Sequence, residues 1–461
     1  MKKLKKNVLL VNWGISTAEF PLKETIRLNE YNVFLACTGK LPKSIRKLFN
    51  KNNLIITNPY DYRVLIQDVV KFVNEKKIEF KIVTTFFEMN VYQTAVLADF
   101  LECKAYLPPA NALKTSVNKA LMRQEIKKAD LKQPRFLVFD KSNQNRAFSF
   151  YQKIRKAVIV KPIHSGHSYG SRFIDKGMNR LELDRQIGKA RDELKIVFDE
   201  WMKYEKDFDN YYLIEEYIGG KMVSFDGVVD KKGKCKFIGN LEFDLTPLPL
   251  LQEIGHTTPV VSLSKSQVNK CKEYVEKIIK AIGLQSCGFH CELKIDKNKI
   301  YLIEIAGRLP GGVVLETYQA VSKTNILDQF FSVFETNSKK SFKLNKHVYR
   351  SESRIGVYCF SDYGRISQIL IPKQTDNRIV KKMISLVKQG ESFYLGKKSF
   401  AKLLMLVKFQ SSKLSAKGIL KKRNEFIKQV KIEIDRNKII KIEFKLKLWI
   451  DQLKRLVKGI K

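Results

Sequence analysis

The sequence predicts a multidomain protein of mixed α/β and α+β class. Three observations lead to this prediction: residues 1–110 alternate short β-rich runs with segments of helical periodicity, Pro108-Pro109 ends that region, and residues 111–336 contain longer strand-like runs interrupted by few helices. Strict alternation is typical of a parallel sheet with crossover helices, whereas consecutive strands are typical of antiparallel sheets covered by helices.

The N-terminal elements are expected in a regular order. Apolar and β-branched runs predict the strands, and apolar residues at helical spacing predict the helices between them. The strands are expected at Val8–Val11, Val33–Ala36, Leu54–Thr57 and Ile82–Phe86, and the helices at Leu22–Asn29, Tyr62–Asn74 and Tyr92–Glu102. A helix over Thr115–Lys128, capped by Thr115 or Ser116, is expected to open the next region.

The later elements are expected to be strands around one long helix, Lys265–Ile282. The strands are expected at Arg135–Phe139, Ala157–Val160, Tyr212–Ile218, Val223–Val229, Cys235–Phe243, Cys287–Ile295, Ile300–Ile305, Arg354–Phe360 and Ile366–Ile371. We therefore expect four parts: an N-terminal α/β domain (1–110), a central region (111–336), a C-terminal α+β unit (337–435) and a basic amphipathic tail (436–461).

Composition narrows the class of protein. The chain has 461 residues, 44% of them hydrophobic, which is too many for a disordered polar chain. No apolar run approaches the roughly 20 residues that span a bilayer. The seven cysteines are scattered and odd in number, a pattern typical of a reduced protein, so we expect a cytoplasmic location.

The formal charge of +39 is spread along the chain rather than gathered in one motif. Such a charge attracts polyanions, but the sequence has no zinc-finger spacing, RNP-like strand or basic zipper, so nucleic-acid binding is not favoured. In the tail, Trp449, Leu453, Leu456 and Ile460 share one helical face. This face predicts packing against the protein or a second subunit, with peripheral contact to an anionic membrane as the alternative.

Two glutamates on neighbouring predicted strands form a candidate metal site. The midpoint between Glu292 and Glu304 falls within the predicted turn Asp296–Lys299, so we expect the two carboxylates to be close cross-strand neighbours. Adjacent carboxylates repel unless a cation lies between them, and oxygen ligands of this kind hold Mg²⁺ or Mn²⁺. Apolar or small neighbours on both strands argue against the alternative, a pair of solvent-facing residues.

Two glycine-containing segments are suited to bind anions. Arg308 precedes Leu309-Pro310-Gly311-Gly312 and a helix from about Val313, so a guanidinium and backbone N–H groups can meet phosphate or carboxylate oxygens there. After the strand that carries Lys161, a loop with Ser165, Gly166 and Ser168 can offer N–H and hydroxyl donors to a triphosphate. It is not a Walker A loop, because no Gly-Lys-Ser/Thr closes it.

The strand that ends in Glu215, Glu216, Tyr217 and Ile218 is a candidate purine site. Backbone groups near Glu216 and Ile218 are placed to read an adenine edge, and apolar side chains can cover its face. A zinc site is a weaker reading of Cys287, His290 and Cys291, because no partner pair stands at ligand spacing. We interpret both cysteines as core residues, and His290 as a possible neighbour of Glu292.

In combination, these segments resemble the ATP-grasp superfamily, particularly the carboxylate–amine ligases of the L-amino acid ligase type. The ordered set is Asn118-Lys119 with Arg123, Lys161-Pro162 with its Gly/Ser loop, Glu215-Glu216-Tyr217-Ile218, Ser224-Phe225-Asp226-Gly227, and Glu292, Glu304 and Arg308. The resemblance covers about residues 114–323. It implies a three-domain architecture: an N-terminal parallel α/β domain, a two-lobed ATP-binding region and a C-terminal α+β lobe.

The resemblance also implies roles for these residues. Lys119, Arg123 and Lys161 with loop residues Ser165, Gly166 and Ser168 would bind ATP, and residues 215–218 would hold its adenine. Glu292 and Glu304 would bind Mg²⁺ (or Mn²⁺), while Arg308 and Lys161 would act on the reacting groups. Such enzymes join small carboxylate and amine substrates through an acyl phosphate and release ADP and phosphate.

Two departures from the family pattern leave an alternative open. Met222 stands where such families usually carry a ribose-binding Glu, and Ala306 stands where an Asn often follows the second metal Glu. The alternative is therefore a non-catalytic ATP-binding regulator, with a basic polyanion-binding protein as a third hypothesis. Because neither departure changes the two carboxylates, we favour an active ligase.

Overall fold

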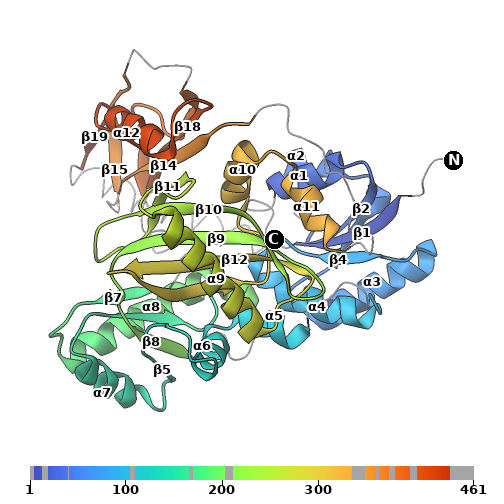
Figure 1. Cartoon of the computed structure of the whole chain (residues 1–461), viewed down its shortest axis with the longest axis horizontal. Helices are drawn as coiled ribbons and strands as arrows, with labels where there is room; N and C mark the ends of the chain where they lie inside the picture. The colour runs from blue at the N-terminus through green and yellow to red at the C-terminus, as the bar shows by residue number, and fades with distance from the viewer. Residues whose placement is uncertain are drawn as a thin grey trace, which may run out of the picture. The chain divides into compact units, whose positions relative to one another are not determined.

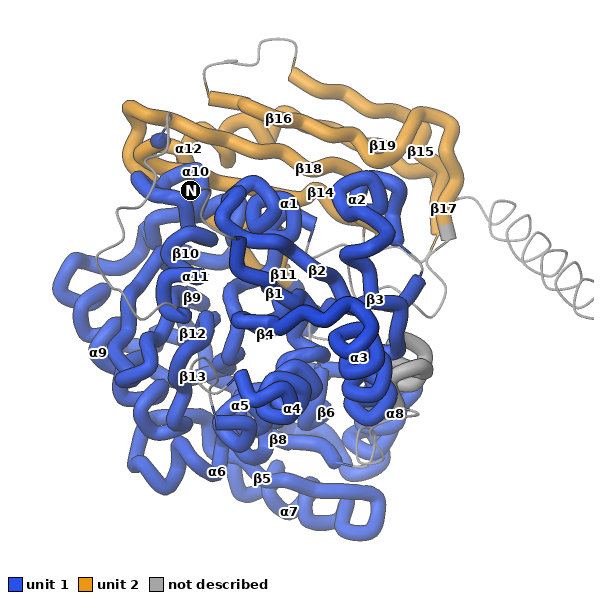
Figure 2. Tube along the Cα trace, turned by 90° about the vertical axis from the view of Figure 1, so that its right-hand side faces the viewer, with its two compact units in different colours: residues 1–243, 247–252, 258–348 blue, residues 244–246, 253–257, 349–461 orange. Residues whose placement is uncertain are grey.

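A computed structural model describes residues 5–12, 19–39, 41–103, 109–165, 170–202, 211–334, 348–359, 363–372, 379–394 and 402–436. The chain divides into two compact units (Figure 2). Unit 1 comprises residues 1–243, 247–252 and 258–348, and unit 2 comprises residues 244–246, 253–257 and 349–461.

Unit 1 begins with a four-stranded sheet of order β3-β2-β1-β4, formed by β1 (Lys6–Val11), β2 (Tyr31–Cys37), β3 (Leu54–Ile56) and β4 (Ile82–Thr84). All of its pairings are parallel, as predicted. Its connections include helices α1 (Glu19–Arg27), α2 (Lys43–Arg46), α3 (Tyr62–Lys76) and α4 (Val91–Phe100) and the short 3₁₀ helices η1 (Lys51–Asn53) and η2 (Glu88–Asn90). Leu9, Phe34 and Leu65 lie in the core between sheet and helices.

The predicted single helix over Thr115–Lys128 is wrong, because two helices meet there. Helix α5 (Ala110–Val117) ends at Asn118, whose extended backbone opens α6 (Lys119–Lys128). The Asn118 side chain accepts hydrogen bonds from the N–H groups of Ala120 and Leu121, and so caps α6 in place of the expected Thr115 or Ser116. This cap fixes Lys119 at the first position of the helix.

A small antiparallel sheet follows, with strand order β5-β8-β6-β7. It contains β5 (Phe136–Phe139), β6 (Val158–Pro162), β7 (Arg172–Ile174) and β8 (Tyr212–Glu216). Helices α7 (Gln144–Ile154) and α8 (Arg180–Met202) pack on it through a shared core that includes Tyr151, Ile187 and Ile214 (Figure 1).

The larger sheet of unit 1 has the order β13-β12-β9-β10, from β9 (Lys221–Val229), β10 (Cys235–Leu245), β12 (Cys287–Asp296) and β13 (Lys299–Ala306). Helix α9 (Lys265–Ile282) has the predicted bounds, and its apolar residues share a core with those of β9, β12 and β13. Helix α10 (Gly312–Val321), predicted from about Val313, and α11 (Ile326–Ser332) follow. Gly220, which has a φ of +80°, lies at the turn before β9; a Cβ there would come within 2.0 Å of the Ile295 carbonyl oxygen.

Unit 2 contains two groups of strands and one helix. Strands β11 (Glu253–Thr258), β14 (Ser351–Cys359), β18 (Lys402–Ser411) and β16 (Val380–Ser385) are neighbours in that order, and β17 (Ser392–Tyr394), β15 (Tyr363–Leu370) and β19 (Lys431–Asp435) form a separate three-stranded sheet. Helix α12 (Ala416–Ile427) packs through Ile419 and Phe426 on Met405, Val407 and Phe409 of β18.

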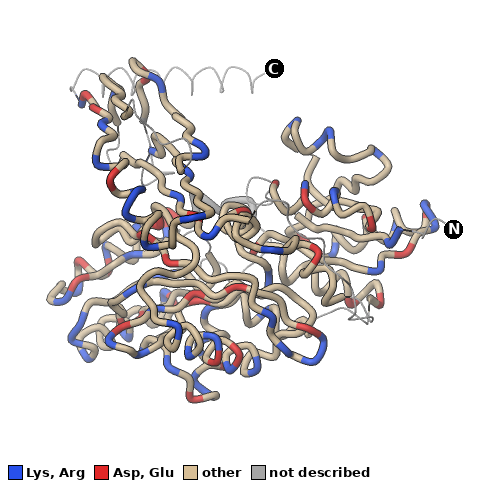
Figure 3. The backbone as a smooth tube through the Cα atoms, turned by 45° about the horizontal axis from the view of Figure 1, so that its top comes forward, with Lys and Arg blue, Asp and Glu red and all other residues tan. Residues whose placement is uncertain are grey.

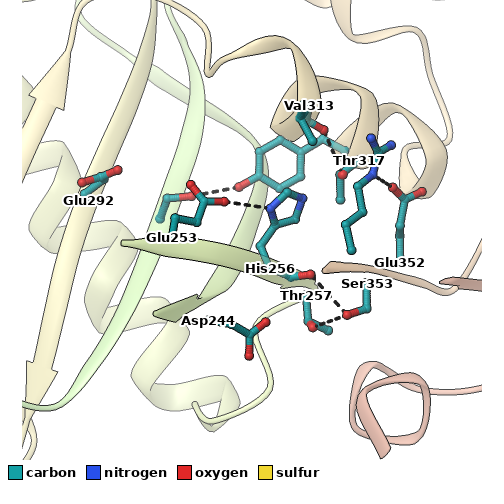
Figure 4. A network of polar contacts seen from close by, with 12 residues as sticks. Asp244, Glu253, His256, Thr257, Glu292, Val313, Thr317, Glu352 and Ser353 are labelled. Atoms are coloured by element: carbon teal, nitrogen blue, oxygen red, sulfur yellow. Dashed lines mark hydrogen bonds and ion pairs between the residues drawn. The ribbon is translucent and has the colours of Figure 1, made fainter. Parts of the chain in front are cut away.

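Inside unit 2, Thr257 and Ser353 form polar contacts that Figure 4 draws as dashed lines, together with the His256 carbonyl. The Thr257 and Ser353 hydroxyls are 2.7 Å apart, and the Ser353 hydroxyl donates to the His256 carbonyl at 3.2 Å. Arg423 of α12 pairs with Asp244 and donates to the Ser353 hydroxyl at 3.0 Å. Because Arg423 is almost fully buried, this network replaces the water that its guanidinium loses.

The positive charge is spread over the structure, as its even spacing along the sequence predicts. Figure 3 shows Lys and Arg along every part of the described chain. Among the described residues, no helix is long and apolar enough to cross a membrane. The predicted amphipathic tail helix lies outside the described residues beyond Arg436.

Candidate active site

Glu292 and Glu304 are directly opposite each other on adjacent strands. Strands β12 and β13 pair in antiparallel register with Glu292 against Glu304, which confirms the predicted proximity. A β-bulge follows this pair, because Leu293 is opposite Leu302 and leaves Ile303 unmatched. The Glu292 and Glu304 side chains remain 23% and 30% exposed, so both carboxylates are open to a ligand.

Lys119 contacts the second of these carboxylates. Its ammonium lies 2.9 Å from Glu304 Oε1 and donates to the Ser165 carbonyl at 2.7 Å, although Lys119 itself is only 5% exposed. Burial opposes ionisation of Glu304, but the charges of Lys119 and Lys161 outweigh it and hold the pKa of Glu304 below its ordinary value. The helix start, the loop after β6 and the end of β13 therefore meet here.

Lys161, Arg123 and Glu215 form a buried cluster beside this contact, here called the structural cluster. Lys161 Nζ lies 2.8 Å and Arg123 Nε 2.7 Å from the Glu215 carboxylate. Arg123 also donates to the carbonyls of Leu302 and Ile303 on β13. Burial of Glu215 opposes ionisation, but the two cations outweigh it and lower the pKa of Glu215 to about 2.

Two residues of the structural cluster, Arg123 and Glu215, were expected to bind the nucleotide but are engaged in contacts within the protein. Arg123 was expected at the nucleotide, yet it has no exposed surface and its guanidinium donates to the Glu215 carboxylate and to the Leu302 and Ile303 carbonyls. The Glu215 side chain was expected near adenine, but both of its oxygens accept from Arg123, and one is paired with Lys161. These contacts tie α6, β6, β8 and β13 together.

His290 adds a cation beside Glu292. It is on the same face of β12, and its ring bridges Asp226 of β9 and Glu292, with 3.3 Å from Nε2 to Glu292 Oε1. Burial favours the neutral ring, but Asp226 and Glu292 outweigh it and raise the pKa of His290 to about 10. Asp226 also accepts from the Tyr318 and Ser224 hydroxyls. The ring is therefore charged and held in place from two sides.

The loop after β6 is described only in part. Ser165 is buried and contributes its carbonyl to Lys119, while Gly166 and Ser168, both expected to bind triphosphate, lie outside the described residues. His164 accepts at Nε2 from the Asn118 amide, so its Nδ1 donates to the Val117 carbonyl. Burial lowers the pKa of His164 to about 4, so this ring is neutral and structural.

The expected purine segment follows β8. Glu216 pairs at 2.8 Å with Arg135 and at 2.7 Å with Lys156, which directs its side chain away from Glu215. The Tyr217 N–H donates to the Ala157 carbonyl at 2.9 Å, and its ring packs edge-on against Phe173. Ile218 is buried, and its carbonyl accepts from Lys294 at 2.7 Å.

Arg308 has partners other than Glu292 and Glu304. Its guanidinium pairs with Glu88 of η2 and donates to the Leu309 carbonyl at 2.8 Å. Arg308 also lines a small cavity of about 30 Å³ together with Thr84, Thr85 and Phe330. The expected anion clamp therefore faces the carboxyl end of the N-terminal parallel sheet, where ligands of α/β sheets commonly bind.

The cysteines match the core interpretation. Cys287 and Cys291 are buried, and burial raises the pKa of both thiols. No group of three or more His, Cys, Asp or Glu residues in the described chain is arranged to hold a metal ion. A zinc site at these residues is accordingly not found within the described chain.

The carboxylate pair nevertheless fits one hard cation. Glu292 and Glu304 each use only Oε1 in the contacts above, which leaves the second oxygen of each available within the described chain. Mg²⁺ takes few protein ligands and fills its remaining positions with water and phosphate oxygens. Two partly exposed carboxylates with lysines nearby are therefore sufficient protein ligands for a magnesium–phosphate complex.

Comparison with known proteins shows a likeness to proteins that contain an ATP-grasp domain. Residues 154–316 match the family model of the ATP-grasp domain. Alanine–anticapsin ligases of Bacillus amyloliquefaciens and Bacillus subtilis are 22% identical over 237 residues, which is 48% of this chain and 48% of each relative. The chain thus spans about half the length of the curated relatives it matches.

Solved structures extend the likeness to the whole fold. The L-amino acid ligase of Bacillus licheniformis matches with a TM-score of 0.72 at 17% identity, over 95% of this chain and 100% of that one. The N5-carboxyaminoimidazole synthetase of Staphylococcus aureus, complexed with ADP, matches with a TM-score of 0.61 at 15% identity, over 93% and 98%. The chain has the ATP-grasp fold. It resembles the carboxylate–amine ligases that include the L-amino acid ligases.

Three neighbours of the candidate site residues were not expected from the sequence: Asp226 as the partner of His290, Glu88 as the partner of Arg308, and Lys294 beside Tyr217. Two of these had a signal in the sequence. His290, Glu292 and Lys294 alternate along one strand, so they share a face, and charged residues that alternate with buried ones indicate a polar lining. Glu88 had none, because its pairing with Arg308 joins residues 220 positions apart.

Proposed function

We propose that the chain is an ATP-dependent ligase that joins a carboxylate to an amine through an acyl phosphate and releases ADP and phosphate. The observation that carries this proposal is the convergence of Lys119, Glu304 and Glu292 where α6 meets the β12–β13 hairpin. The ATP-grasp match and the likeness to L-amino acid ligase support it.

Nucleotide binding is assigned to groups on both sheets. Glu292 and Glu304 would hold Mg²⁺ or Mn²⁺, which neutralises phosphate charge when bound. Lys119 and Lys161 supply further positive charge next to Glu304. The backbone of residues 216–218, oriented by the structural cluster, would read adenine. Positioning and electrostatic stabilisation would thus account for most of the catalysis.

The chemistry then follows in two steps. A substrate carboxylate oxygen attacks the γ-phosphorus of ATP, and ADP departs. The amine nitrogen next attacks the activated carbonyl carbon, phosphate leaves, and the nitrogen loses a proton. Arg308, once released from Glu88, would stabilise the substrate carboxylate or the acyl phosphate through paired N–H donors. A cytoplasmic location suits such a reaction, and all seven cysteines are free thiols.

The test is a screen for ADP release over amino acids and other small carboxylates, with mass detection of any adduct. A product whose mass equals acid plus amine minus water supports the ligase. ATP binding without ADP release across the screen would instead favour the regulator that Met222 and Ala306 suggested. Steeply salt-dependent binding to nucleic acid that survives Glu292→Gln and Glu304→Gln would favour the polyanion-binding protein.

A further inference from the structure

Lys294 is a buried lysine that the proposed reaction does not use. It lies on β12, two residues after Glu292, and is 6% exposed. The pairing of β12 with β9 is continuous from Cys287 to Ile295, so the alternation of side chains places Lys294 on the same face of the strand as Glu292. Two residues correspond to about 7 Å along a strand, so the two side chains can meet different parts of one ligand.

The charge of Lys294 is incompletely satisfied. Its ammonium donates one hydrogen bond, to the Ile218 carbonyl at 2.7 Å, and lies 4.4 Å from the centre of the Tyr217 ring. An ammonium has three N–H donors. Within the described residues, no carboxylate is at ion-pair distance from Lys294. Burying a cation with one neutral acceptor and one aromatic ring is unfavourable, which points to a further acceptor that a ligand supplies.

The neighbours of Lys294 indicate which part of the ligand this is. Tyr217 and Ile218 belong to the segment whose backbone is proposed to read the base, whereas the phosphate-binding lysines gather at Glu304. The cross-strand partners of Lys294 are Met222 on β9 and Tyr301 on β13, and neither offers a carboxylate. The missing hydrogen-bond acceptor of Lys294 is therefore expected on the base of the nucleotide rather than on its phosphates.

We propose that Lys294 binds the nucleotide base by donating a hydrogen bond to an unprotonated ring nitrogen of a purine, N3 or N7. The site would therefore prefer purine nucleotides that keep this nitrogen. This inference rests on the proposed nucleotide-dependent function, and it adds a base-recognition residue to it.

The test is calorimetric binding, with Mg²⁺ present, of ADP, 7-deaza-ADP, 3-deaza-ADP and 2′-deoxy-ADP. The unaltered chain is expected to bind one of the two deaza analogues about tenfold more weakly than ADP. Lys294→Met is expected to bind ADP about tenfold more weakly and to lose that discrimination. Lys232→Met, which removes an exposed lysine in the turn after β9, is the matched control and should behave as the unaltered chain.

Each outcome decides the matter. Equal binding of ADP and both deaza analogues overturns the base contact, as does discrimination that persists in Lys294→Met. A loss confined to 2′-deoxy-ADP assigns the contact to the ribose and also contradicts the proposal. Absence of ADP binding to the unaltered chain overturns the proposed function and this inference together. Thermal unfolding without nucleotide should show Lys294→Met at least as stable as the unaltered chain, because an incompletely paired buried charge is removed. The comparison of ADP with the deaza analogues on the unaltered chain tests the proposal even if the variant does not fold.

Discussion

Two neighbouring groups of charged residues in unit 1 differ in burial and in how many of their polar atoms have protein partners. In the structural cluster, Arg123, Lys161 and Glu215 are all less than 10% exposed, and the Glu215 carboxylate is bonded by both cations. In the metal pair, Glu292 and Glu304 retain exposed surface and one oxygen each without a described partner. Arg123 and Glu215 of the first group have little capacity left for a ligand, whereas Lys161 keeps further N–H donors and the second group still has coordination to offer.

The two groups therefore differ in their expected roles. The charges of the structural cluster stabilise the fold, whereas the carboxylates of Glu292 and Glu304 are proposed to bind a ligand. Removing one partner of a buried ion pair leaves an uncompensated charge and destabilises the fold. Replacing a partly exposed carboxylate by its amide costs less stability, because the amide oxygen can still accept from Lys119 or His290, but it removes a charged metal ligand. Substitutions in the two groups should therefore affect different measurements: stability for the structural cluster, and metal-dependent turnover for Glu292 and Glu304.

The largest effect is expected from Glu304→Gln, with Glu292→Gln as its companion. Each removes one charged metal ligand, so Mg²⁺-dependent ADP release should fall by about a thousandfold, in the range seen when a key electrostatic group is lost. Thermal unfolding should stay within a few degrees of the unaltered chain. Glu273→Gln on the exposed face of α9 is the matched control. Retained turnover in both variants would contradict the metal assignment.

Arg123→Met should act on stability instead. It leaves Glu215 without its guanidinium and the Leu302 and Ile303 carbonyls without donors, so the free energy of unfolding should fall by about 3–5 kcal/mol. Urea unfolding measures this loss. The double variant Arg123→Met with Glu215→Gln should recover part of it, because the unpaired carboxylate is then neutral. A single variant as stable as the unaltered chain would remove the structural role.

The pH dependence of folding should report Glu215. Its folded pKa of about 2 lies below the ordinary glutamate pKa of 4.5, so its contribution to stability is complete above pH 4.5 and is lost as the pH falls towards 2. Urea unfolding across this range should show a steeper acid loss in the unaltered chain than in Glu215→Gln. Parallel profiles for the two proteins would show that Glu215 is not stabilised in this way.

The smallest effect is expected at the partner of Arg308. Glu88→Gln removes the carboxylate that competes for the guanidinium, while Arg308 keeps its bond to the Leu309 carbonyl. If Arg308 binds the substrate carboxylate, the KM for that substrate should fall by about threefold, as for a weak, partly exposed ion pair. Steady-state kinetics with the substrate from the ADP-release screen measures this change. An unchanged KM would separate Glu88 from substrate binding.

The fold could be predicted where the signal is local. Helix α9 and the β12–β13 hairpin were predicted with nearly correct bounds, because α9 has a capping box and a left-handed glycine end and the hairpin has a polar turn. The break at Asn118 was missed because a capping side chain and a mid-helix asparagine look alike in sequence. Strands β16 and β19 were missed because none of their residues is buried, so they lack an apolar signal. Strands β17 and β18 were also missed, although six residues of β18 are buried.

The candidate site was predictable as a set of residues and not as a set of contacts. Residue types and order placed Lys119, Lys161, Glu292 and Glu304 together, and the structure brings them to one place. Whether Arg123 serves the nucleotide or the fold depends on two carbonyls 179 and 180 positions away, which no sequence pattern reports. The position of the Arg308 guanidinium likewise depends on Glu88 of η2, 220 positions earlier in the chain.

The central claim is that Glu292 and Glu304 together hold the metal that accompanies the nucleotide. The most direct test is electron paramagnetic resonance of Mn²⁺ titrated into the protein with and without ADP. The account predicts that ADP strengthens Mn²⁺ binding in the unaltered chain and in Glu273→Gln, and that the double variant Glu292→Gln with Glu304→Gln loses this effect while remaining folded. ADP-dependent Mn²⁺ binding that is undiminished in the double variant would contradict it.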